Sequence, residues 1–469
     1  MMFPLRRFLQ KHPLPCDDVS VPGADVFPSF YGIPLLLLAG MAVSLSSCAS
    51  VMTVQPQVSR LASSGRYAQA LTTLENRQAV YGKNNQLLFL LEKGMILHLN
   101  GQYRESVAVF EDAKLRWEEL YTESLSKITA SWVVNDYTLP YRGEDFERVM
   151  VNIFQALNFA VLEDFESALV EARDVDSKLA AINGQYPPGQ KNVYREDAFA
   201  RLLAGILYES AGSYSNLNDA FISYEKAYEA YTSDYREQYD LDPPQVLLEN
   251  LCTMARWMGG SKEEQYRDAF SGQECQSLQE KSRKGEVIVI QYHGLTPGKR
   301  SESVLVPLPG GYISSFSFPQ YSARFYEDGL RLISAHDQQG GVVHAETEVG
   351  EDISRIARKN LADRKTRILI KGVARPMGRY FIERHIENKI KEKHGREESR
   401  WFPILASFFN LMLEQADLRS WQTLPAEIRI ARFILDPGHY AFYLDQDVLL
   451  GDVTLSRGQK RFILFCSNP

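Results

Sequence analysis

The apolar positions of this chain follow two different periods. From Gln57 to Phe270 they recur every three or four residues, which is the spacing of amphipathic helices. From Val287 onward, short runs rich in valine, isoleucine and aromatic residues are separated by Pro-Gly and Gly-Gly turns, as in β-strands. Helical spacing returns at about residues 350–422 before strands resume. The pattern predicts an α+β multidomain protein in which a helical domain precedes a β-rich one.

The helical half contains a degenerate repeat. A turn of the Gly-x-Tyr type is followed at helical spacing by small and aromatic residues, and the copies begin at Gly65, Gly101, Glu163 and Gly212. Small residues let two antiparallel helices approach, and aromatic residues fill the gaps between stacked pairs. We therefore predict a tetratricopeptide-repeat-like (TPR-like) α-helical domain over residues 57–275. A plain helical bundle is the alternative.

The β-rich half has strand patterns on both sides of its helical segment. The simplest account is one β-sandwich-like domain over residues 287–469 with a helical insertion at about 350–422, and two separate β units are the alternative. The charged residues 276–286 between the two halves predict a linker.

A short apolar run near the N-terminus ends in a lipobox. Ile33–Leu45 spans 13 positions, which suits a signal peptide, whereas a membrane-spanning helix needs about 20. Leu45-Ser46-Ser47-Cys48 follows, so we expect a lipoprotein signal peptide at 1–47, acylation of Cys48 and a lipidated tether at 48–56. No aspartate follows the cysteine, which favours the periplasmic face of the outer membrane. A buried cysteine behind an ordinary hydrophobic helix is the alternative.

Charge and cysteine content narrow the class of protein further. The net charge of −7 argues against a nucleic-acid binder. In an oxidising periplasm Cys252 and Cys275 could pair and leave Cys466 alone, but three independent thiols fit the spacing as well. There is no Gly-x-Ser-x-Gly, Walker or Rossmann motif, and no Cys/His cluster of the zinc type. We expect no catalytic residue, cofactor or metal, and no enzymatic activity.

Two stretches carry the candidate partner-binding residues. The first is Tyr141, Arg142, Glu144, Asp145 and Arg148, where acidic residues precede a helix. They fit an N-terminal cap, and alternatively a charged lip of a concave groove. The second is Asp417, Arg419 and Trp421, between helix and strand patterns. Tryptophan and arginine are frequent at interface hot spots, but such residues also form structural junctions.

Several stretches together resemble an uncharacterised family of TPR-containing bacterial outer-membrane lipoproteins. They are the Cys48 lipobox, residues 141–148, 156–160, 168–173 and 414–421, and the strand Ile428–Leu435 before Pro437-Gly438. The resemblance implies an outer-membrane lipoprotein without known catalytic residues and with a role in envelope assembly.

The predicted function is therefore that of a lipid-anchored adaptor. Its membrane contact is the acylated Cys48, and its TPR-like groove binds a segment of an envelope protein that the sequence does not identify. The alternatives are a periplasmic enzyme acting on cell-wall material, with acid and base groups brought together only by the fold, and a ligand-binding sensor that uses the β domain.

Overall fold

A computed structural model describes residues 51–127, 139–184, 194–270, 275–308, 312–322, 326, 329–394 and 416–467. These residues belong to one unit, 49–469, and the lipobox with Cys48 lies outside them. Within the described ranges, no helix combines the length and the apolar composition needed to cross a membrane.

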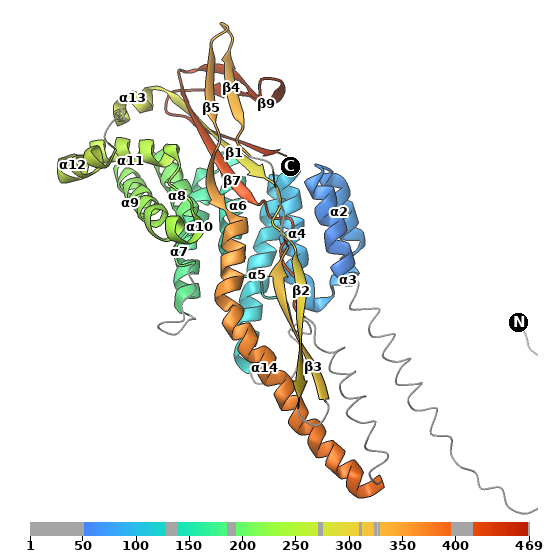
Figure 1. Ribbon diagram of the computed structural model, residues 1–469. Helices are drawn as coiled ribbons and strands as arrows, with labels where there is room; N and C mark the ends of the chain where they lie inside the picture. The colour runs from blue at the N-terminus through green and yellow to red at the C-terminus, as the bar shows by residue number, and fades with distance from the viewer. Residues whose placement is uncertain are drawn as a thin grey trace, which may run out of the picture. The chain divides into compact units, whose positions relative to one another are not determined.

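The first half of the chain folds into antiparallel helices that follow one another in a row (Figure 1). Residues 51–63 are helical. They are followed by α2 (Tyr67–Asn76), α3 (Gln78–Tyr81), α4 (Gln86–Leu99), α5 (Tyr103–Lys127), α6 (Asp145–Val161), α7 (Phe165–Gly184), α8 (Ala198–Ala211), α9 (Tyr214–Ala230), α10 (Arg236–Tyr239), α11 (Gln245–Met258), α12 (Gly260–Ala269) and α13 (Leu278–Arg283). A 3-10 turn, η1 (Lys83–Asn85), precedes α4, and a π-helical turn, η4 (Tyr231–Tyr235), precedes α10.

The four predicted repeat starts are the places where the chain reverses between helices. Gly65, Gly101, Glu163 and Gly212 all have positive φ, between 62° and 74°. At the first three, the next backbone N–H bonds back to the helix just ended, as Gln102 does to the carbonyl of Leu97 at 2.9 Å. This left-handed ending stops a helix and turns the chain, and glycine adopts it without a steric penalty.

Small residues bring the paired helices into close contact. A Cβ atom at Gly94 of α4 would lie 2.6 Å from the ring of Phe110 on α5, and one at Gly205 of α8 would lie 2.3 Å from the ring of Tyr224 on α9. Ser106 of α5 also donates a hydrogen bond to the carbonyl of Gly94 at 2.9 Å. The glycine–aromatic pattern seen in the sequence therefore reflects real helix–helix contacts.

The described residues of the second half form two four-stranded sheets and a two-stranded ribbon. The first sheet has the order β10-β1-β7-β6, and the second β5-β4-β8-β9; β2 pairs with β3. The strands are β1 (Gly285–His293), β2 (Lys299–Leu308), β3 (Tyr312–Tyr321), β4 (Leu332–Asp337), β5 (Val342–Glu346), β6 (Glu348–Asp352), β7 (Glu427–Leu435), β8 (Gly438–Leu444), β9 (Val448–Leu455) and β10 (Lys460–Ser467). Strand β1 runs parallel to β10 and antiparallel to β7. Strands from both sides of the helical insertion therefore share each four-stranded sheet.

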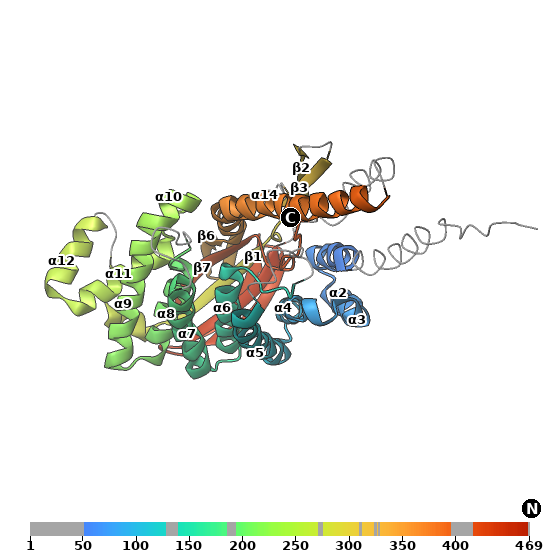
Figure 2. The ribbon, with the colours of Figure 1, turned by 90° about the horizontal axis from the view of Figure 1, so that it is seen from below.

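The first sheet is buried on both faces. Ile288, Ile290 and Tyr292 of β1 belong to the helical core, while Val287 and Val289 share a second core with strands of the other sheet. Figure 2 shows the helices side by side along one face of β1 and β7. Because both faces are covered, β1 carries a continuous apolar run from Val287 to Ile290 instead of alternating.

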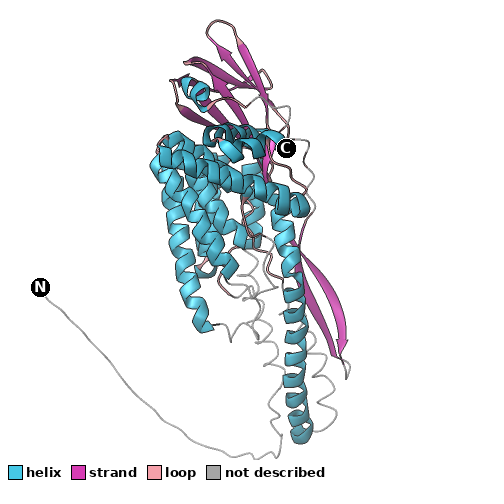
Figure 3. Ribbon diagram, turned by 90° about the vertical axis from the view of Figure 1, so that its left-hand side faces the viewer, coloured by secondary structure: helices cyan, strands magenta, loops and turns pink. Residues whose placement is uncertain are grey.

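The described part of the insertion contains the long helix α14 (Ile353–His394), and the β2–β3 ribbon lies beside it. Figures 1 and 3 show both extending away from the two four-stranded sheets. We call β2, β3 and α14 together the arm.

Two predicted boundaries differ from the structure. The helix at 51–63 begins inside the predicted tether, because Val51, Val54 and Val58 face inward and are buried. In the predicted linker, Ser277 and Glu280 form a capping box that starts α13. Burial in the first case and capping in the second thus make helices of parts of the predicted tether and linker.

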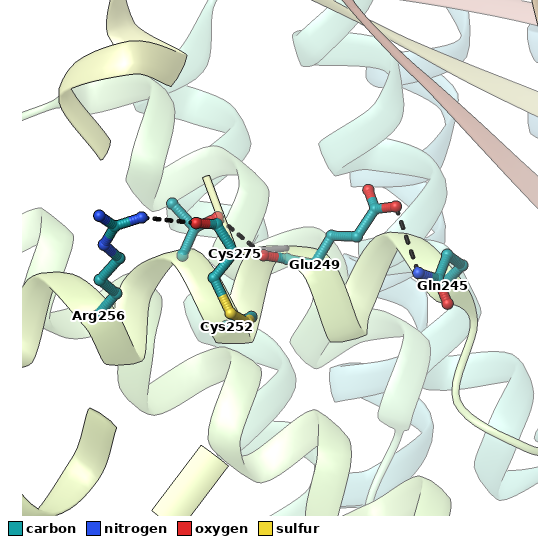
Figure 4. Close-up of a disulfide and its surroundings, with 6 residues drawn as sticks. Gln245, Glu249, Cys252, Arg256 and Cys275 are labelled. Atoms are coloured by element: carbon teal, nitrogen blue, oxygen red, sulfur yellow. Dashed lines mark hydrogen bonds between the residues drawn. A yellow bond between two sulfur atoms is a disulfide. The ribbon is translucent and has the colours of Figure 1, made fainter. Parts of the chain in front are cut away.

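Cys252 of α11 forms a disulfide with Cys275, with the two Cα atoms 5.4 Å apart (Figure 4). Arg256 donates a hydrogen bond to the carbonyl of Cys275 at 2.7 Å, which also holds the segment at Cys275 against α11. Cys466 is a free thiol. Of the two arrangements that the sequence left open, the structure has the paired one.

Reducing this disulfide is expected to lower the free energy of unfolding by about 3 kcal/mol, since the bridge closes a loop with a sequence separation of 23. Urea denaturation with and without dithiothreitol measures the effect. A Cys252→Ser/Cys275→Ser variant is the control, because its transition should not respond to the reductant. An unchanged transition in the native chain would contradict the prediction.

Candidate functional site

The two candidate stretches meet at one place in the fold. The backbone N–H of Trp421 donates to the Glu147 carboxylate on α6 at 3.1 Å, across a sequence separation of 274. Segment 416–424 thereby packs against the start of α6, next to the base of the arm. We call this region the junction.

Acidic residues cap the start of α6, as the sequence predicted. Glu144 is the N-cap residue, and its backbone N–H donates to the carboxylate of Glu147 at 2.9 Å in a capping box. The hydroxyl of Tyr141 donates to the same carboxylate at 2.7 Å. The N-cap interpretation is confirmed, and Glu147, one of the acidic residues at this helix start, is the residue that gathers the donors.

The carboxylate of Glu144 connects α6 to the arm. It accepts from Lys299 of β2 at 2.6 Å and from Asn360 of α14 at 3.4 Å, and it forms an ion pair with Arg364 of α14. Glu144 and Lys299 are both largely buried. Three elements distant in sequence therefore converge on one carboxylate.

Arg419 is only 1% exposed, and its guanidinium is fully engaged within the chain. Nε and Nη2 donate to the two oxygens of Asp417 at 2.8 and 2.7 Å. Nη1 donates to Asn85 at 3.0 Å and to the carbonyl of Leu139 at 2.9 Å. The group also stacks over the ring of Tyr141, with 5.5 Å between the guanidinium carbon and the ring centroid.

Trp421 is equally buried. Its ring lies against Phe110 and Phe154, with centroids 5.9 and 6.2 Å away, and its indole N–H donates to Thr423 at 3.0 Å. The indole fills the space between α5, α6 and the segment leading into β7. This is the structural-junction interpretation of the second stretch.

Four of the eight candidate partner-binding residues are not available at the surface. Tyr141, Glu144, Arg419 and Trp421 are buried against their own chain, because each completes the hydrogen bonding or packing of another segment. Of the other candidates, Arg142 is exposed, while Asp145, Arg148 and Asp417 are partly exposed. Arg148 pairs with Glu118 of α5 at 2.5 Å.

A second polar cluster, absent from the sequence candidates, lies beside the junction. Gln55 donates to Glu92 of α4 at 2.7 Å and to the carbonyl of Ser420 at 3.0 Å, and Tyr81 donates to Glu92 at 2.5 Å. Further along α4, His98 bonds to Asn158 at 2.6 Å and to Tyr292 of β1 at 2.7 Å. Isolated polar residues within the apolar α4 sequence were the signal that could have revealed them.

Burial shifts the titration of these groups. It raises the pKa of Glu92 and of Glu147 from 4.5 to about 7, and their hydrogen-bond donors offset part of the shift. It lowers the pKa of His98 from 6.5 to about 4, because the charged imidazole is disfavoured away from water. Near neutral pH each of the two carboxyl groups is therefore partly protonated.

These shifts give stability a definite pH dependence. A carboxyl whose pKa rises on folding contributes stability that is fully present below pH 4.5 and is lost as the pH rises through about 7. His98 acts oppositely, but only below pH 6.5. Between pH 6.5 and 8 the free energy of unfolding should therefore fall.

Urea denaturation at a series of pH values in this range measures that slope. A Glu92→Gln/Glu147→Gln variant should show a smaller slope, because its amides do not titrate. Stability that rose from pH 6.5 to 8 in the native chain would contradict the assignment.

The inner face of the helical layer is covered by the chain itself. His98 of α4 and Phe154 of α6 contact Tyr292 of β1, and a Cβ at Gly350 of β6 would lie 2.7 Å from the ring of Phe199 on α8. The predicted groove for a partner segment is therefore occupied by the first sheet, because the sheet needs an apolar layer over its second face.

Two hollows lie along the arm. One, of about 260 Å³, lies between β3 and α14, and its lining includes Phe318, Tyr321, Arg358, Leu361, Lys365 and Ile368. The other, of about 370 Å³, lies where α10 meets α14, and its lining includes Tyr239, Asp240, Arg355, Arg358 and Lys359. Both combine apolar or aromatic surface with cations.

Within the described ranges, no group of three or more His, Cys, Asp or Glu residues is placed to hold a metal ion. The candidate residues hold α6, the arm and segment 416–424 together, and the hollows lie on the arm. No family model matches the chain, and neither a curated protein nor a solved structure matches it.

Proposed function

We propose that this chain is an outer-membrane lipoprotein, anchored through acylated Cys48 on the periplasmic face, that acts as an adaptor in cell-envelope assembly or maintenance. The observation that carries the proposal is the lipobox, with Cys48 three residues ahead of the buried residue Val51. A lipid on Cys48 would hold the folded unit close to the membrane, because so few residues separate the two.

We further propose that the helices form a TPR-like stack. The four turns of like conformation and the glycine–aromatic contacts of α4–α5 and α8–α9 support this proposal. Since the sheet fills the inner face, the partner would bind the outer face. The second helix of each of three successive pairs exposes an apolar side chain there: Leu115 of α5 is 64% exposed, Val170 of α7 60% and Ile222 of α9 40%.

The anchor is tested by labelling cells with a palmitate analogue. The native chain should incorporate the label and fractionate with the outer membrane, whereas a Cys48→Ala variant should do neither. A native chain that stayed unlabelled and kept residues 1–47 would overturn the proposal.

The partner surface is tested by photo-crosslinking in living cells. A crosslinker at Leu115, Val170 or Ile222 should capture the same envelope protein, whereas one at the buried Phe154 should capture none. Capture by a crosslinker on the arm, but by none on these three helices, would reject the outer face as the binding surface.

The hollow between β3 and α14 favours a second candidate, a ligand-binding sensor that uses the β-rich half. A small-molecule ligand that fits there should raise the melting temperature, and replacing Leu361 with tryptophan should abolish that rise by filling the hollow. The wall-acting enzyme has no comparable support. Glu92 and Glu147, the buried carboxyls with a pKa of about 7, are enclosed by hydrogen-bond donors of their own chain.

A further inference from the structure

The first turns of α14 carry a stripe of cations. Arg355, Arg358 and Lys365 lie along one side of the helix, with Ala362 on the same side between the last two. All four are exposed. This part of the surface is therefore positively charged, although the chain as a whole has a net charge of −7.

Two of these cations, Arg358 and Lys365, form no ion pair with a described carboxylate, although Arg358 is near enough to Asp352 to lower the pKa of that carboxyl. Arg355 pairs with Asp352 at 2.9 Å, and the neighbouring Lys359 pairs with Asp363 at 3.2 Å. Among the residues that the structure describes, no carboxylate lies within ion-pair distance of Arg358 or Lys365. The ammonium of Lys365 lies over the ring of Phe318, 5.7 Å from its centroid. An anionic group could approach both side chains without breaking an ion pair.

Apolar surface adjoins the two free cations. Phe318, Leu361 and Ile368 line the hollow that Arg358 and Lys365 also line. On β2 of the same ribbon, Val304 is 52% exposed and Leu305 is 64% exposed. Positive charge beside exposed apolar side chains is the composition of surfaces that lie in the headgroup region of a membrane.

The base of the arm lies near the start of the folded unit. Lys299, the first residue of β2, donates to the carbonyl of Arg419 at 3.2 Å, and Gln55 donates to the next carbonyl, that of Ser420, at 3.0 Å. Gln55 stands one helical turn after Val51, and three extended residues span at most roughly 11 Å. A lipid on Cys48 would therefore bring the membrane surface close to the base of the arm.

We infer that the arm binds the surface of an anionic phospholipid membrane beside the anchor. Arg358 and Lys365 would contact lipid phosphates, while Val304, Leu305 and the rim of the hollow would reach the boundary with the acyl chains. The inference rests on the proposed function, because the membrane comes within reach through Cys48. It gives the adaptor a defined orientation, with the arm on the lipid.

The test uses the full chain with Cys48→Ala, so that no lipid is attached, and vesicles of phosphatidylglycerol and phosphatidylethanolamine. Sedimentation should show binding that is absent with phosphatidylcholine vesicles. Arg358→Gln/Lys365→Gln should weaken the binding by about 30-fold, the factor expected for two cations near an anionic surface. The matched control, Lys226→Gln/Arg267→Gln, removes the same charge from exposed positions on α9 and α12 and should bind as the unsubstituted chain does.

A second pair of variants tests the apolar contribution. Val304→Ser/Leu305→Ser on β2 should weaken vesicle binding at least fivefold. Val342→Ser/Val343→Ser, which changes side chains of similar exposure on β5, should leave it unchanged.

Three outcomes would overturn the inference. They are no binding to anionic vesicles, equal losses in the arm and control variants, and full competition by millimolar glycerol phosphate, which would indicate a site for a soluble phosphate ester. Palmitate labelling of the native chain would be unaffected in each case, so failure of the arm inference is distinguishable from failure of the anchor.

Discussion

Replacing Trp421 with alanine is expected to lower the free energy of unfolding by about 3–5 kcal/mol, the usual cost of removing a fully buried aromatic side chain. The indole is 1% exposed, contacts Phe110 and Phe154, and donates to Thr423. Because the ring is packed between residues of α5 and α6, the cavity cannot close without moving both helices. Equilibrium denaturation in urea, followed by circular dichroism, measures the change.

Trp257 of α11 provides the matched control. It is partly exposed and packs against Tyr214, itself 80% exposed, at a centroid distance of 5.2 Å. Trp257→Ala should therefore cost clearly less than Trp421→Ala. Equal losses for the two variants would show that Trp421 is not a central packing residue.

Replacing Arg419 with methionine should cost about 3 kcal/mol, because each buried acceptor that loses its donor costs roughly 1–3 kcal/mol. Asn85 and the carbonyl of Leu139 would each lose a donor, and Asp417 would lose both of its hydrogen bonds from the guanidinium. Methionine has a similar length, so the loss reports mainly on polar contacts and not on a cavity.

Arg142 lies in the other candidate stretch and is exposed, which makes it the control for this substitution. Arg142→Met should change the free energy of unfolding by no more than about 0.5 kcal/mol. If Arg419→Met were equally mild, the guanidinium would not hold the junction together, and the partner-binding interpretation of Arg419 would regain support.

These expectations separate folding from binding in the junction. If the free energy of unfolding falls much more for the buried-site variants than for the exposed-site controls, residues 141–148 and 416–424 act mainly by fixing the base of the arm to α6. Since Glu144 accepts from Lys299 and Asn360, the same carboxylate that begins α6 also positions β2 and α14. A change at the junction is therefore expected to disturb the arm as well.

Local features of the fold were readable from the sequence because their causes are local. The turns at Gly65, Gly101 and Gly212 need a backbone conformation that glycine adopts readily. The cap at Glu144–Glu147 depends on residues three positions apart. The apolar run of β1 indicated a buried strand, although not which layers cover it.

The sequence by itself determined that a helical half precedes a β-rich one, where helix pairs reverse and where a lipobox stands, because each depends on neighbouring residues and their periodic burial. Only the tertiary structure decided that the first sheet fills the inner face of the helices, that Glu144, Arg419 and Trp421 are buried in one junction, and that α14 and the β2–β3 ribbon form an arm. These contacts join residues far apart in the chain. The sequence shows which residues need a hydrogen-bond partner or an apolar contact. Which residue meets that need depends on how the elements pack in three dimensions.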